Sequence, residues 1–160
     1  MRKRFLTNRN LFLGSLLLTG LLVGCSSDDN SGDVEIPGTE SHTYKYTVTV
    51  DQPIDESDFI SFVIVGGNQN PNNNTIWKVN GEVQTGQASV SFNDQSFETT
   101  NTYVVETIDP IRLSTSGASF INFGNDLKFR YKIEVDGKEV VSEDQTLSGD
   151  SKSWNKDYTF

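Results

Sequence analysis

The 160-residue chain contains one cysteine, one histidine and one methionine, and the first two scarcities exclude whole classes of protein. A single Cys cannot form an intrachain disulfide, which rules out a disulfide-stapled scaffold. A single His rules out most zinc sites and His-based catalytic triads. Thirteen Lys and Arg stand against 22 Asp and Glu, for a net charge of −9. This acidic balance argues against a nucleic-acid partner, because phosphate binding needs clustered cations.

The basic residues are unevenly distributed, and four of them lie among the first nine positions. They precede an uncharged apolar run over residues 11–23. A secretion signal has an apolar region of roughly 7 to 15 residues, whereas a membrane-spanning helix needs about 20. The pattern therefore predicts that residues 1–24 are a signal peptide rather than a stable membrane helix.

The apolar run ends in Leu22-Val23-Gly24-Cys25, which resembles the lipobox of bacterial lipoproteins. The resemblance implies cleavage between Gly24 and Cys25, diacylglycerol on the Cys25 thiol and an acyl chain on its new amino group. Several acyl chains make membrane anchoring stable, since each buried CH₂ contributes ~0.8 kcal/mol. Two alternatives stay open at this point: a free buried Cys behind an ordinary signal peptide, and an uncleaved anchor.

The segment that follows, residues 26–42, contains five acidic residues, no Lys or Arg and very few apolar side chains. Such a composition cannot offset the entropy of ordering, so it predicts a flexible tether over residues 25–42, with Cys25 at its membrane end. His42 is expected to be unstructured in this tether rather than a metal ligand.

Ser27-Asp28-Asp29 stands close behind Cys25 and resembles the acidic export signal of surface-exposed lipoproteins in Bacteroidetes, especially flavobacteria. The resemblance implies that the protein is attached to the outer membrane and faces the cell exterior. A solvated acidic spacer with a domain facing the periplasm is the alternative.

From residue 43 onward the sequence shows short strand patterns separated by turn residues, with no helical spacing. Residues 59–65 are apolar at almost every position, which predicts a central strand covered on both faces. Strands are expected at 44–50, 59–65, 75–79, 82–85, 88–93, 102–109, 112–115, 119–123, 128–135, 138–145 and 154–160. This spacing predicts an all-β fold for residues 43–160, an antiparallel two-sheet sandwich. The arrangement resembles immunoglobulin-like sandwiches, with Trp77 in the place of their core tryptophan and without their disulfide.

Two dipeptides, Asn80-Gly81 and Asp136-Gly137, predict two-residue hairpin turns, because both accept the positive φ values of a type I′ turn. For the second hairpin, a two-residue loop pairs Ile133 with Val140 and Tyr131 with Ser142. That register places Phe129, Tyr131, Ile133 and Val140 on the core side and sets Arg130 opposite Glu143.

A search for catalytic motifs finds no nucleophile elbow, phosphate-binding loop or metalloprotease motif, and no Cys outside the lipobox. Acid–base chemistry would fall to carboxylates, as in glycosidases. The candidates are Asp55, Glu56, Asp58, Asp94, Glu98, Glu106 and Asp109. No spacing favours any two of them, so a solvated acidic face is expected and no catalytic residue is assigned.

Calcium is the most plausible cofactor besides the covalent lipid, because it binds carboxylate, amide and carbonyl oxygens on loops. Two places offer such oxygens: Asp55 with Glu56 and Asp58, and Asn125 with Asp126. Neither matches an EF-hand loop, and charged turns that need no metal are the default. No metal ligand is therefore assigned.

Two features suggest ligand binding. The loop over residues 66–74 consists of Gly, Asn, Gln and Pro, and Asn70, Asn72 and Asn73 offer the donors and acceptors that hold sugar hydroxyls. Trp154 stands between Ser153 and Asn155 and offers a ring for stacking on a sugar. A plain loop and an ordinary strand aromatic are the alternatives.

These observations predict a lipid-anchored, non-enzymatic binding or adhesion module for a glycan or protein, displayed on the cell surface. One alternative is a periplasm-facing accessory lipoprotein of an outer-membrane complex, and a weaker one is a small carboxylate-dependent hydrolase. Cleavage after Gly24 removes four bases and no acid, which leaves a net charge of −13.

Overall fold

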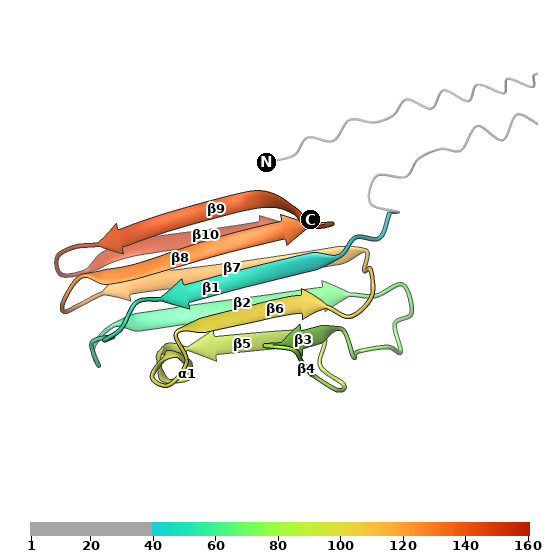
Figure 1. The fold of residues 1–160 in the computed structure, drawn as a ribbon, viewed down its shortest axis with the longest axis horizontal. Coiled ribbons are helices and arrows are strands. Elements are labelled where there is room, and N and C mark those ends of the chain that lie inside the picture. The colour runs from blue at the N-terminus through green and yellow to red at the C-terminus, as the bar shows by residue number, and fades with distance from the viewer. Residues whose placement is uncertain (1–39) are drawn as a thin grey trace, which may run out of the picture. The chain divides into compact units, whose positions relative to one another are not determined.

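The computed structural model describes residues 40–160, which form a sandwich of two antiparallel sheets (Figure 1). The predicted all-β sandwich is therefore confirmed. The predicted cleavage site, lipid attachment site and export signal lie outside the described residues: Gly24, Cys25, Ser27, Asp28 and Asp29. Within residues 40–160, no helix has the length and apolar character to cross a bilayer.

The six-stranded sheet has the order β4-β3-β6-β1-β8-β9 and the four-stranded sheet the order β10-β7-β2-β5. The elements are β1 Tyr44–Val50, β2 Phe59–Gly67, β3 Trp77–Val79, β4 Glu82–Val83, β5 Ser89–Asn93, α1 Asp94–Phe97, β6 Thr102–Thr107, β7 Leu113–Asn122, β8 Leu127–Val135, β9 Lys138–Leu147 and β10 Lys152–Thr159. Consecutive strands pair only in the β3–β4 and β8–β9 hairpins of this region, and every other connection crosses between sheets. An immunoglobulin domain has sheets ABED and CFG, so the resemblance holds for the two-sheet architecture but not for the strand order.

The core follows from period-2 alternation, since every second side chain of a strand points inward. Inward-facing residues of β1, β2 and β8 are almost completely buried, as the sequence predicted for β1 and β8: Tyr44, Tyr46, Val48, Val50, Ile60, Phe62, Ile64, Phe129, Tyr131 and Ile133. Trp77 is fully buried, which confirms it as a core residue. Its indole Nε1 donates a hydrogen bond to the carbonyl of Ala88 at 3.0 Å.

Strand β7 is one strand where the sequence predicted two. The prediction ended one strand at residue 115 and began another at 119. In the structure Gly117 stays paired with Val63 of β2 on one side and Asp157 of β10 on the other. Two flanking ladders hold the glycine in extended backbone, so it does not interrupt the strand.

The β8–β9 hairpin begins in the predicted register and then departs from it. Asp136 and Gly137 both have positive φ, as the turn type requires, but a bulge after Glu134 shifts the ladder. Ile133 pairs with Val141, Tyr131 with Glu143 and Arg130 with Asp144. Val140 is consequently 46% exposed, so its predicted place in the core was wrong. A bulge adds one residue to one strand, which turn rules alone do not reveal.

Two local features were not predicted from the sequence. Residues 94–97 form the short helix α1, which begins at a capping box in which Asn93 and Ser96 exchange side-chain and backbone hydrogen bonds. His42, placed in the flexible tether, is ordered instead. It forms an isolated bridge with Ile111, and its Nδ1 lies 2.6 Å from Oδ2 of Asp136.

Candidate functional site

The outer faces of the two sheets differ sharply in charge. The outward side chains of the six-stranded sheet include many ionised groups, among them Lys45, Glu106, Lys128, Arg130, Lys132, Glu134 and Asp144. The outward positions of the four-stranded sheet contain a single charged residue, Asp157. We call this surface the neutral face: Phe59, Ser61, Val63, Val65, Gly67, Ser89, Ser91, Asn93, Leu113, Thr115, Gly117, Ser119, Ile121, Ser153, Asn155, Asp157 and Thr159.

The neutral face exposes apolar side chains on its central strand. Phe59, Val63 and Val65 of β2 are 45%, 37% and 45% exposed, and Leu113 of β7 is 49% exposed. The sequence predicted that β2 would be covered on both faces, and this was wrong, since nothing in residues 40–160 covers the outer one. Clustered exposed apolar groups on a soluble domain mark an interaction surface.

A groove crosses the neutral face at Gly117. It encloses about 300 Å³ and is lined by Ser61, Val63, Gly117, Ala118, Ser119, Asn155, Lys156 and Asp157. The missing side chain of Gly117 makes the groove, because a Cβ there would lie 2.9 Å from Oδ1 of Asp157. Ser119 Oγ donates to Oδ1 of Asn155 at 2.6 Å, which fixes one wall. Val63 thus forms an apolar wall of the groove, and Ser119 and Asn155 form a polar wall.

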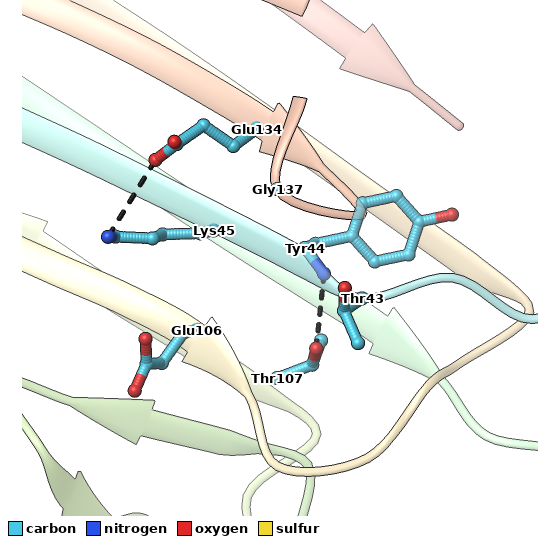
Figure 2. A pocket seen from close by; sticks show the side chains of 7 residues that line it. All are labelled: Thr43, Tyr44, Lys45, Glu106, Thr107, Glu134 and Gly137. Carbon is cyan, nitrogen blue, oxygen red and sulfur yellow. Dashed lines mark hydrogen bonds and ion pairs between the residues drawn. The ribbon is translucent and has the colours of Figure 1, made fainter. Parts of the chain in front are cut away.

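A second hollow lies where the chain enters the sandwich, on the charged outer side of the six-stranded sheet (Figure 2). It encloses about 250 Å³, and Figure 2 shows Lys45 between the carboxylates of Glu134 and Glu106. Lys45 Nζ lies 3.8 Å from Glu134 Oε2, and the Tyr44 amide donates to Thr107 Oγ1 at 3.1 Å. These polar groups pair with one another, which leaves little for a ligand.

A third hollow, of about 500 Å³, lies between the β1–β2 loop and α1 and collects several predicted carboxylates. Its lining consists of Gln52, Ile54, Asp55, Glu56, Asp94, Gln95 and Glu98. Hydrogen bonds from the Ser57 hydroxyl and amide lower the pKa of Asp55, and the amide of Asn125 adds to this. A general acid needs a raised pKa, so this shift runs opposite to the one a glycosidase acid requires.

The two predicted calcium-binding groups meet in space, because the β1–β2 loop packs against the β7–β8 turn. Asp58 accepts from the amides of Phe123, at 2.9 Å, and Asp55, at 3.3 Å. Asp55 in turn accepts from Asn125. These carboxylates are therefore occupied by N–H donors, which hold the two loops together. In residues 40–160, no three His, Cys, Asp or Glu side chains are grouped as metal ligands.

The predicted asparagine ligands belong to a loop that uses its amides locally. Oδ1 of Asn70 accepts from the Asn72 amide at 3.0 Å, and Oδ1 of Asn73 accepts from the Thr75 amide at 3.1 Å. The loop also contacts the start of the described chain, since Gln69 Nε2 donates to Ser41 Oγ at 2.9 Å. These amide oxygens shape the loop.

Trp154 faces the core and not solvent, so its predicted stacking role was wrong. It is 9% exposed, and its ring packs against Phe120, Phe129 and Tyr131. The sequence analysis missed the neutral face, although it contained a signal for it. Residues 59–77 and 113–125 are free of charge in a chain in which 22% of residues are charged.

No family model and no curated protein matches the sequence. Three solved structures share its fold. A DUF4425 family protein from Bacteroides ovatus has a TM-score of 0.55 at 17% identity, and the match covers 76% of this chain and 95% of that one. The calcium-bound form of a protein from Parabacteroides distasonis has a TM-score of 0.56 at 18% identity, covering 79% and 99%. A DUF4425 domain of unknown function from Bacteroides vulgatus has a TM-score of 0.55 at 17% identity, covering 75% and 94%. The chain therefore has the fold of DUF4425 domains from Bacteroides species.

Proposed function

We propose that this protein is a lipid-anchored, non-enzymatic binding or adhesion module of the outer membrane, displayed on the cell exterior, and that its glycan or protein ligand binds the neutral face. The observation that carries the proposal is the exposure of Phe59, Val63 and Val65 on a face with one charge. Burying such a face against a ligand removes apolar area from water without stripping ions of their hydration.

The anchor in this proposal is lipid on Cys25, supported by the lipobox sequence Leu22-Val23-Gly24-Cys25. The Ser27-Asp28-Asp29 motif supports surface display. The described chain enters the sandwich at one end, where His42 contacts Ile111 and Asp136 (Figure 1).

Calcium is not part of the proposed mode of binding. The neighbour from Parabacteroides distasonis binds calcium, but here Asp55 and Asp58 accept hydrogen bonds from backbone amides of the adjoining turn. These bonds join the two loops in the way that a bridging cation joins loops elsewhere.

The neutral face is tested by a substitution that adds charge without changing the fold. We expect Val63→Lys to abolish binding of labelled protein to glycan arrays and to intact cells, because a desolvated ammonium opposes the contact. Val140→Lys is the matched control, since Val140 is similarly exposed but lies on β9 of the other sheet. Equal binding by the Val63→Lys variant and the unchanged protein would show that another surface binds the ligand.

The anchor and its orientation are tested in cells. Cys25→Ala is expected to release the protein from membranes into the soluble fraction. Protease applied to intact cells is expected to remove the domain together with a surface control. A domain that survives while that control is cleaved would place it in the periplasm instead.

A further inference from the structure

We propose that the neutral face takes a second copy of this chain, in a parallel twofold dimer whose two tethers leave from the same end. The inference rests on the proposed function and names the partner of the same face. It follows from the register of the outward side chains on β2 and β7.

Two of the five outward pairs of the β2–β7 ladder set a large side chain beside a glycine. The ladder runs from Phe59 paired with Ile121 to Gly67 paired with Leu113, and its central pair is Val63 with Gly117. Two exposed side chains therefore each lie beside a glycine on the neighbouring strand: Val63 beside Gly117, and Leu113 beside Gly67. Each copy thus presents both a projection and a recess, about 5 Å apart.

A twofold axis along the strands, between β2 and β7, makes these features complementary. It places β2 of one copy over β7 of the other, so that Val63 of each copy enters the recess at Gly117 of its partner. An axis across the strands at the level of Val63 would instead set Val63 against Val63 and leave the recess at Gly117 empty. An axis across the strands at the level of Val65 would also fill the recesses, with Val63 over Gly67 and Leu113 over Gly117, but the two tethers would then leave from opposite ends. Attachment of both copies to one membrane therefore selects the axis along the strands.

The whole central row of the neutral face obeys the same symmetry. The row reads Asp157, Gly117, Val63 and Ser91 across β10, β7, β2 and β5. The twofold axis reverses the order of this row in the second copy. The carboxylate of Asp157 in one copy then lies opposite the hydroxyl of Ser91 in the other, which is a hydrogen-bond donor. The next row reads Asn155, Ser119, Ser61 and Asn93, and its reversal sets amide against amide and hydroxyl against hydroxyl. Sheets packed face to face cross at about 30°, which keeps these central rows in contact.

Charge also favours a second copy on this face. Residues 40–160 contain eighteen Asp and Glu against nine Lys and Arg, so two copies repel each other over most approaches. The outward positions of the neutral face contain one charged residue, Asp157, and Lys156 also lines its groove. An approach through this face therefore brings together fewer like charges than one through the six-stranded sheet.

The area is sufficient for a weak, specific dimer. Strands β2, β5, β7 and β10 have 9, 5, 10 and 8 residues, which at ~3.3 Å per residue and ~4.8 Å spacing give about 510 Å² per face and about 1,000 Å² for the pair. That is near the lower limit of specific interfaces, for which a dissociation constant on the order of micromolar is expected. The parallel arrangement puts both tethers at one end, so two anchors enter the same membrane, where confinement strengthens a weak contact.

The experiment uses residues 40–160, which hold all ten strands and the complete core. Sedimentation velocity from about 1 to about 500 µM is expected to show a concentration-dependent dimer. Gly117→Val fills the recess and Val63→Gly removes the projection, and each is expected to weaken the dimer at least about tenfold. The double variant exchanges projection and recess and is expected to restore dimerisation.

Val140→Lys is the control and is expected to dimerise like the unchanged protein, and circular dichroism checks that each variant is folded. A monomer at the highest concentration, unchanged dimerisation by a folded Gly117→Val variant, or no recovery in the double variant would each overturn the proposal. A monomer whose ligand binding is still lost in Val63→Lys would overturn the dimer and leave the proposed function standing.

The parallel orientation is tested by distances between nitroxide labels, since residues 40–160 contain no cysteine. Asn72→Cys labels the end where the chain enters, and Asp150→Cys labels the opposite end, in the β9–β10 loop. In a parallel dimer, pairs of like labels are closer than mixed pairs of Asn72 and Asp150 labels. The reverse order would overturn the shared direction of the tethers.

Discussion

The phenol oxygen of Tyr131, on β8, lies 2.7 Å from the hydroxyl of Ser116, on β7, and this bond joins the two sheets through the core. Tyr46 of β1 makes the equivalent bond to Ser114 of β7 at 2.6 Å. All four side chains are buried. A hydroxyl on one sheet therefore satisfies a hydroxyl on the other in two places, and β7 supplies both serines.

Removing one partner of such a pair leaves the other unsatisfied. We expect Tyr131→Phe to lower the free energy of unfolding by about 1–3 kcal/mol, because the Ser116 hydroxyl stays buried without its partner. Urea denaturation measures the change. Adding Ser116→Ala to Tyr131→Phe should recover part of the loss, since both polar groups are then gone. A double variant less stable than the sum of the single variants would contradict this pairing.

The same tyrosines predict a loss of stability at alkaline pH. Burial raises the pKa of Tyr46 to about 12 and raises that of Tyr131 further. The unfolded chain releases these phenol protons near pH 10 while the folded chain retains them, so the stability present below pH 10 falls as pH rises. The slope is expected to reach about 1.4 kcal/mol per pH unit for each tyrosine. Urea denaturation between pH 9 and 12 tests this, and Tyr131→Phe should reduce the slope.

Gly66 is required where Trp77 crosses β2. A Cβ at Gly66 would lie 2.7 Å from Cζ2 of Trp77, a rigid and fully buried ring. We expect Gly66→Ala to destabilise the fold by about 1–3 kcal/mol, measured by thermal denaturation. Gly67→Ala is the matched control, because its Cβ would lie 3.5 Å from Leu113 Cβ, an ordinary contact. Equal melting temperatures for the two variants would show that Trp77 can move aside.

Asp136 ties the start of the described chain to the β8–β9 turn. Its carboxylate accepts from the Thr43 amide at 2.8 Å and contacts His42 Nδ1 at 2.6 Å, and these contacts lower its pKa, His42 most. Because the pKa of Asp136 is lower in the folded chain than in the unfolded chain, its contacts stabilise the fold fully above pH 3.8, the unfolded pKa. This stabilisation is lost as the pH falls through the lower pKa of the folded chain. Asp136→Asn should therefore speed amide exchange at Thr43 at neutral pH. Unchanged exchange would show that the His42–Ile111 bridge alone holds this segment.

Calcium should have little effect on the sandwich. A cation that bound only the folded state at a dissociation constant near 1 mM would add a few tenths of a kcal/mol at 1 mM and more at 10 mM. Because backbone amides already occupy Asp55 and Asp58, we expect no rise in melting temperature across that range. Asp58→Asn should destabilise the fold equally with and without calcium. A rise in melting temperature with calcium that Asp58→Asn abolishes would establish a metal site here.

The sequence predicted strands correctly where apolar and polar residues alternate. Its predictions failed where contacts with other strands determine the strand length or register. Tyr44, Tyr46, Val48 and Val50 alternate with polar residues, and that face is buried as expected. Residues 116–118 were left between two predicted strands, but ladders to β2 and β10 hold Gly117 extended. Turn chemistry correctly assigned the Asp136-Gly137 hairpin, whereas the bulge that exposes Val140 lies in the β8–β9 ladder beyond the turn.

Candidate site residues were harder to predict, because composition does not reveal orientation. The residues around Trp154 suggested an exposed ring, but its position in the β10 ladder directs the side chain into the core. Asn70 and Asn73 offered free amides, but each binds a backbone amide two residues ahead. The apolar run of β2 predicted burial of both its faces. Only the two-sheet arrangement shows that the outer face of β2 is uncovered.

By itself, the sequence determined the all-β class and the two turns with positive φ, because these depend on side-chain alternation and local backbone sterics. The lipobox prediction is equally local, since it rests on four adjacent residues. Only the tertiary structure decided that Val63 lies beside Gly117 in the middle of an uncovered sheet face. Residues 54 positions apart become neighbours through strand order and register, which depend on the packing of all ten strands and on no local pattern.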